Sequence, residues 1–236
     1  MSGMAQAGED GPVRRRNGLR RPLIAGLIVL VGSAAAVRSA SEGEAAVEVR
    51  RIESRLNGIR GLIGRFTQTL ESPALPGPQE ESGTLYLLRP GRMRWEYERP
   101  AGKLAIADGV RTLLYIPAER QAVIAPLPEG GSDTGIAFLL RPNIDLLGEF
   151  HVAWGERETD AGRATLVLTP KNGQKAFDHL VLEVAEDYLI DAMIVVEPLG
   201  STITYRFSDL RLVPDLDAAL FRFDPPPGTD IQEVVP

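Results

Sequence analysis

Few residues in this chain of 236 residues are of the types that carry out catalysis or bind metals. The two histidines, His151 and His179, are 28 positions apart, there is no cysteine, and no acidic loop of the calcium-binding type occurs. The sequence therefore predicts no metal site. Ser201 and Ser208 lie in strand-like runs without a paired base, and there is neither a Gly-rich phosphate loop nor a nucleophile elbow. We expect no nucleophilic catalysis and no phosphate chemistry.

Pairs of carboxylates also occur, such as Glu96 with Glu98 and Glu183 with Glu186. Alternation along a strand would place both members of a pair on its solvent face, which favours a solvated rim over a general acid–base pair. The sequence therefore predicts a protein that is not an enzyme and that needs no cofactor.

The stretch from Gly83 to Pro100 is the most informative part of the chain. Its second half alternates between an apolar side and a charged side, which is the pattern of a strand with one wet face. The apolar side carries Met93, Trp95 and Tyr97, and the solvent side carries Arg92, Arg94, Glu96 and Glu98. Its first half is apolar from Leu85 to Leu88, and Arg89-Pro90-Gly91 predicts a hairpin turn between the two. The stretch therefore predicts two paired strands with an arginine at the rim of an apolar surface.

The first 41 residues have the pattern of an export signal. Residues 14–21 are densely basic, and residues 22–37 are apolar and end in small residues. This run is shorter than the roughly 20 residues that span a bilayer, so we interpret residues 1–41 as a cleaved signal peptide, with a retained anchor as the alternative. Arg15-Arg16 faintly resembles a twin-arginine signal, but Gly18 stands where that signal needs an apolar residue, which favours general secretion.

Removal of residues 1–41 takes six Lys/Arg and two Asp/Glu from totals of 26 and 32, which leaves a net charge near −10. Such a surface repels nucleic acid and anionic lipid headgroups. Without cysteine, the chain has neither a disulfide nor an N-terminal lipidation site. The sequence thus predicts one soluble domain outside the cytoplasm, residues 42–236, which at this length buries a core without covalent cross-links.

Residues 45–63 have apolar side chains at helical spacing and predict one amphipathic helix. After it the pattern changes to short strands separated by turns, among them a hairpin at Asp108-Gly109. Besides the two strands of the Gly83–Pro100 stretch, we expect strands at 65–71, 103–107, 110–116, 121–125, 150–154, 164–169, 179–184, 189–196, 202–210 and 219–223. The fold class is therefore mainly β, with eleven or twelve strands in one strongly curled antiparallel sheet.

Residues 126–148 are the least sheet-like part, with helical turns expected at 136–140 and 144–147. Their apolar side chains, Phe138 and Leu140 among them, are expected either to plug the core or to form a lid. The helix at 45–63 likewise either packs permanently on the sheet or covers it and can be displaced. One helix covers too little of such a sheet, so the sequence favours a concave apolar cavity that suits an acyl chain, since burial of each methylene contributes about 0.8 kcal/mol.

Several short motifs together resemble the periplasmic outer-membrane lipoprotein carrier protein family (LolA). They are FTQT at 66–69, Gly83 with Leu85, RPGRMRWEY at 89–97 with Pro100, ADG at 107–109, LLYIP at 113–117 with Gln121, and FRFDPPPGTD at 221–230. The likeness extends over about residues 46–233.

The resemblance implies an incompletely closed antiparallel β-barrel whose concave face is covered by helices that act as a lid. It also implies a carrier that takes acylated lipoproteins from an inner-membrane lipoprotein-releasing ABC transporter and delivers them to an outer-membrane acceptor. In the family, an arginine before the proline of this turn holds the lid, and it falls on Arg89. An aromatic residue at the mouth falls on Met93, which is apolar and adaptable.

Together these patterns predict a monomeric lipoprotein carrier with Arg89 as the lid latch. The residues expected to line the acyl cavity or the lid are Leu85, Leu87, Met93, Trp95, Tyr97, Phe138 and Leu140. A module that senses lipids or lipoproteins with the same half-barrel is the alternative.

Overall fold

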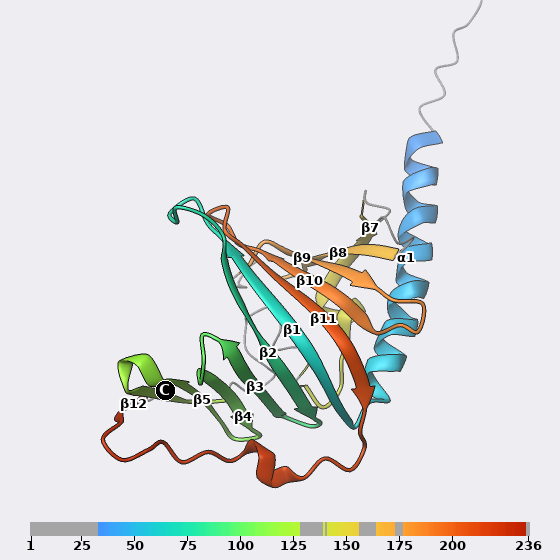
Figure 1. Cartoon of the computed structure of the whole chain (residues 1–236). Helices are drawn as coiled ribbons and strands as arrows, with labels where there is room; N and C mark the ends of the chain where they lie inside the picture. The colour runs from blue at the N-terminus through green and yellow to red at the C-terminus, as the bar shows by residue number, and fades with distance from the viewer. Residues whose placement is uncertain (1–32, 128–138, 140, 156–163, 173–176, 235–236) are drawn as a thin grey trace, which may run out of the picture.

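The computed structural model describes residues 33–127, 139, 141–155, 164–172 and 177–234. These residues form one twelve-stranded sheet in the order β12-β6-β5-β4-β3-β2-β1-β11-β10-β9-β8-β7 (Figure 1). The sheet is open, because its edges are the unconnected strands β12 and β7. This confirms the predicted incompletely closed β structure, with twelve strands.

Every neighbouring pair in this sheet is antiparallel except β12 and β6, which run parallel. The bounds of the strands are β1 (Gly61–Glu71), β2 (Gln79–Leu88), β3 (Arg92–Arg99), β4 (Leu104–Asp108), β5 (Arg111–Ile116), β6 (Gln121–Pro126), β7 (Phe150–Trp154), β8 (Ala164–Pro170), β9 (His179–Val184), β10 (Ile190–Val196), β11 (Thr202–Leu212) and β12 (Asp230–Glu233). The helices are α1 (Ser33–Asn57), η1 (Pro117–Glu119), α2 (Leu146–Glu149) and η3 (Ala218–Phe221).

Helix α1 packs on the concave face of the sheet and contacts β7 and α2 (Figure 1). Its side chains at Val49 and Ile52 are fully buried, as the helical spacing predicts. The helix ends at Asn57, six residues earlier than expected, and Gly58 follows it. The apolar residues beyond this point belong to the loop and to β1, where Leu62 and Phe66 face the core with the period of a strand.

The C-terminal segment differs most from expectation. Residues 219–223 were expected to form a strand, but η3 occupies this region, with the carboxylate of Asp217 accepting the backbone N–H of Ala219. The segment crosses the convex face, where Phe221 packs with Leu104 and Ile106 in a second hydrophobic core. Phe221 and Phe223 alternate as strand residues would, but they do so because both pack on this core, not because they belong to a strand.

This segment also covers part of the face that was expected to be wet. Arg94 donates from Nη1 to the carbonyl oxygen of Leu220 at 2.8 Å and from Nε to Glu96 at 2.6 Å. The expectation of a fully solvated face for β3 is therefore wrong at Arg94. Glu98, nearer the end of β3, remains exposed and pairs with Arg65 of β1.

Gly83 is required where β3 bulges against β2. The register shifts between Ser82 and Gly83, and a Cβ atom here would overlap the carbonyl oxygen of Glu96 and lie 2.9 Å from the Cα of Tyr97. Both obstacles are backbone atoms. We therefore expect Gly83→Ala to lower the free energy of unfolding by about 1–3 kcal/mol.

Chemical denaturation followed by circular dichroism measures this change. Gly77→Ala is the control, because a Cβ at Gly77 meets no atom within 4 Å. Equal stabilities for the two variants would contradict the prediction.

Candidate functional site

The concave face brings four of the predicted cavity residues together. By strand register Leu85 lies opposite Trp95, and Leu87 lies opposite Met93. All four are buried, with 3–6% of each residue exposed. Tyr97 lies on the same face, partly buried against this core. Phe138 and Leu140 lie outside the described residues.

A small apolar cavity lies between this face and the residues that cover it, among them Leu56 and Leu139. Its volume is about 40 Å³, room for about one water molecule. The cavity is lined by Leu56, Ile59, Leu62, Leu85, Leu87, Leu139, Leu189, Ile190, Phe207 and Leu210. An acyl chain is far larger, so the cavity accepts one only if α1 or the residues around Leu139 move away from the sheet.

Aromatic side chains form the next layer along the concave face. Phe66 lies edge-on to Trp95, with ring centroids 4.4 Å apart, and to Tyr97 at 5.1 Å. Trp95 also meets Tyr205 edge-on at 5.7 Å. Burial raises the pKa of Tyr205 to about 12 and raises that of Tyr97 further, so both hydroxyl groups keep their protons at physiological pH.

Arg89 joins the β2–β3 turn to the residues that cover the concave face. From Nη1 it donates to the carbonyl of Leu56 at the end of α1, at 2.6 Å. From Nη2 it donates to the carbonyls of Arg141 and Pro142 and, at 3.3 Å, to Oδ1 of Asn57. Burial lowers the pKa of Arg89, but an arginine keeps its charge across the biological pH range. One guanidinium fork thus binds two separate pieces of the covering layer.

Asn57 is a second residue of this junction that sequence reasoning did not identify. Its side-chain amide donates from Nδ2 to the carbonyl of Ile144 at 3.0 Å, and its Oδ1 accepts the backbone N–H of Ile144 at 2.8 Å. Glu53, one turn earlier, accepts the backbone N–H of Leu147 at 2.9 Å. These bonds tie α1 to the segment 141–147, and the two together form the covering layer that we call the lid.

We expect Asn57→Ala to loosen the lid without unfolding the domain. The substitution leaves both backbone groups of Ile144 without this partner, a loss of about 1–3 kcal/mol. Amide hydrogen exchange should then become faster at Ile144 and Leu147 while the central strand β1 keeps its protection. Asn57→Asp keeps the acceptor but not the donor, so its exchange rates at Ile144 and Leu147 should lie between those of the wild type and of Asn57→Ala. Equal exchange rates in all three proteins would contradict the role assigned to Asn57.

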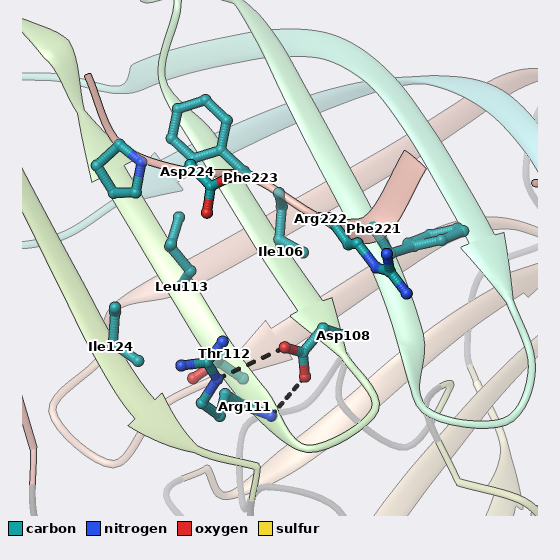
Figure 2. A pocket seen from close by; sticks show the side chains of 11 residues that line it. Ile106, Asp108, Arg111, Thr112, Leu113, Ile124, Phe221, Arg222, Phe223 and Asp224 are labelled. Atoms are coloured by element: carbon teal, nitrogen blue, oxygen red, sulfur yellow. Dashed lines mark hydrogen bonds and ion pairs between the residues drawn. The ribbon is translucent and has the colours of Figure 1, made fainter. Parts of the chain in front are cut away.

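A second pocket, larger than the apolar cavity, lies elsewhere. It has a volume of about 350 Å³ and lies on the convex face, between β4–β6 and residues 221–225 (Figure 2). Asp108 and Arg111 line one end of it as an ion pair with a separation of 3.6 Å. Because its wall carries charges, this pocket suits an acyl chain less well than the smaller apolar cavity.

Among the described residues no group of three or more His, Asp or Glu side chains could hold a metal ion. Glu183, expected on the solvent face, is instead buried and pairs with Arg206 at 3.3 Å, whereas Glu186 is exposed. The expected alternation of buried and exposed residues fails at the end of strand β9, because residues 182–184 are all buried.

In the part of the chain that the structure describes, no helix is both long and apolar enough to cross a membrane. Most of the predicted signal peptide precedes Ser33 and lies outside the described residues. Helix α1 runs through the predicted cleavage region near Ser41.

Comparison with known proteins agrees with this architecture. Residues 57–224 match the family model described as outer membrane lipoprotein carrier protein LolA. The outer-membrane lipoprotein carrier protein of Dechloromonas aromatica is 33% identical over 184 residues, which cover 78% of this chain and 86% of the relative. That of Pseudomonas aeruginosa strain PAO1 is 30% identical over 86% of this chain and 96% of the relative.

A solved structure of an uncharacterized conserved protein from Thermus thermophilus has the same fold. It aligns with a TM-score of 0.51 at 14% identity, over 81% of this chain and 99% of that one. The family match covers most of the open sheet, the Arg89 turn and the segment on the convex face. The chain therefore belongs to the outer membrane lipoprotein carrier protein family.

Proposed function

We propose that this protein is a periplasmic carrier that holds the acyl chains of lipoproteins on the concave face of its sheet. The observation that carries the proposal is the apolar cavity beneath the lid, with Arg89 bonded to both pieces of the covering layer. Family membership supports the same role, since the named relatives are lipoprotein carriers and not enzymes.

In this proposal the bonds from Arg89 to Leu56 and Arg141 define the closed carrier. Cargo binding breaks the bonds from Arg89 to Leu56 and Arg141, and the lid moves off the leucines of β2. Each acyl methylene then gains about 0.8 kcal/mol on leaving water. Each broken neutral bond costs only about 0.5–1.5 kcal/mol, and a bond to a charged group about 1.5–3. Because an acyl chain has many methylenes, this gain exceeds the loss of the few Arg89 bonds. Those bonds offset part of the affinity and so favour release of the cargo.

The proposed route starts at an inner-membrane lipoprotein-releasing ABC transporter and ends at an outer-membrane acceptor. A net charge near −10 after residue 41 keeps the carrier from adhering to anionic headgroups on the way. The protein acts as a monomer and needs no cofactor in this scheme.

Native mass spectrometry of the protein purified from its own periplasm tests the proposal. We expect a fraction of the molecules to carry an acylated protein, released when the complex is activated in the gas phase. A co-purified phospholipid or glycolipid in place of acylated protein would contradict the carrier role and favour lipid sensing. The same spectrum gives the mass of the mature N-terminus and so tests cleavage near Ser41.

A further inference from the structure

A group of polar side chains lies on the concave face beyond the aromatic layer. It consists of Gln68, Glu81, Tyr97 and Lys103, and we call it the polar rim cluster. Strand register places Gln68 opposite Glu81 on one side and opposite Tyr205 on the other. The backbone N–H of Tyr97 donates to the carbonyl of Lys103 at 3.0 Å. Strands β1, β2 and β3 and the residue that precedes β4 thus deliver polar groups to one end of an otherwise apolar face.

The centre of the cluster is an ion pair that reaches over a strand. The ammonium of Lys103 lies 2.6 and 2.7 Å from the two carboxylate oxygens of Glu81, and 4.3 Å from the ring centroid of Tyr97. Only 18% of the Lys103 side chain and 22% of the Glu81 side chain are exposed. A largely covered ion pair contributes little net stability, because desolvation offsets the attraction.

The cluster also has unused hydrogen-bonding capacity. An ammonium has three donors, and the two contacts with Glu81 leave one of them for a ligand. The hydroxyl of Tyr97 lies 3.4 Å from Oε1 of Gln68, too long for a strong bond. A carboxylate can in addition accept a peptide N–H. This donor and acceptor set suits uncharged ester and amide groups.

We propose that the polar rim cluster binds the ester and amide groups that join the acyl chains of the cargo to its peptide. The proposal rests on the carrier function proposed above. It fixes the orientation of the cargo: the acyl chains extend toward Arg89 and α1, and the peptide leaves past the β1–β2 and β10–β11 turns. These turns lie side by side (Figure 1) and are joined by a 2.9 Å hydrogen bond between Ser201 and Ser72.

Two probes separate this subsite from the acyl cavity. One is a synthetic diacylated lipopeptide, and the other is a long-chain fatty alcohol that has neither ester nor amide. In the double variant Lys103→Met/Glu81→Gln we expect the Kd of the lipopeptide to rise about tenfold. The Kd of the alcohol should stay within about twofold of the wild-type value. Equal changes for both probes, or none for either, would overturn the proposal.

The matched control is Arg65→Met/Glu98→Gln. This pair likewise reaches over one strand, from β1 over β2 to β3, but it lies on the convex face and is more exposed. It should leave the affinity for both probes unchanged. If the concave double variant does not fold, Tyr97→Phe and Lys103→Gln serve in its place. Each should weaken the affinity for the lipopeptide less than the double variant does and leave the affinity for the alcohol unchanged. A wild-type protein that bound no lipopeptide would contradict the carrier function itself.

Photo-cross-linking tests the orientation independently. Benzoylphenylalanine at Leu70, beyond Gln68 on the same face of β1, should cross-link the peptide part of the lipopeptide. The same residue at Ile59, which lines the apolar cavity, should cross-link an acyl chain. The reverse pattern would overturn the proposed orientation.

Discussion

Replacement of Arg89 by leucine is expected to slow the release of bound lipopeptide to acceptor vesicles by about ten- to a hundredfold. The guanidinium donates to Leu56, Arg141 and Pro142 in the closed state. Leucine makes none of these bonds, so the closed, empty state loses stability relative to the open one. Cargo that holds the lid open then dissociates more slowly, and by linkage its affinity rises.

The variant Arg92→Leu controls for the loss of a positive charge at the same turn. Arg92 lies against Gly109 rather than against the lid, so its replacement should leave release at the wild-type rate. Asn57→Ala should slow release less than Arg89→Leu, because Arg89 still reaches Leu56 and Arg141. Transfer at an unchanged rate in Arg89→Leu would show that the arginine is not the latch.

The second large effect is expected at Trp95. Its indole is buried between Phe66 and Tyr205, and its Nε1 lies 2.7 Å from the sulfur of Met93. Trp95→Ala should lower the free energy of unfolding by about 3–5 kcal/mol, because the substitution removes apolar contact and leaves a cavity. In this layer the cavity would extend the apolar space beneath the lid.

The only other tryptophan, Trp154, provides the control. It lies on the edge strand β7 and is 38% exposed. Trp154→Ala should therefore lower the free energy of unfolding by less than about 1 kcal/mol. Urea denaturation followed by far-ultraviolet circular dichroism compares the two without relying on tryptophan fluorescence. A loss at Trp154 as large as that at Trp95 would contradict the assignment of Trp95 to the core.

Most of the sheet was predictable because local signals agree with the fold. The alternation around Trp95 gives the buried face of β3, and Asp108-Gly109 gives a turn in which the Asp108 carboxylate accepts the N–H groups of Val110 and Arg111. The end of α1 was not predictable from periodicity alone, since the strand that follows also places an apolar residue at helical spacing. Strand β12 was missed because all four of its residues are exposed and carry no burial pattern.

The site was less accessible to sequence reasoning. Sequence pattern alone gives Arg89 as a turn residue, and only the resemblance to a family indicated that it contacts a lid. Asn57 has the appearance of any polar residue at a helix end, because its partner Ile144 is 87 residues away. Contacts between residues so far apart in the sequence depend on how the sheet curls, and no local sequence motif predicts that curvature.

The central junction of the sheet has a consequence for the order in which the protein can fold. Strand β1 pairs with β11 along most of its length, from Leu62 opposite Leu212 to Glu71 opposite Thr202. Nearly the whole domain must therefore emerge before the middle of the sheet can form. Such distant pairing makes loop closure costly and folding slow. A chain that stays unfolded for longer remains able to pass through a narrow translocation channel.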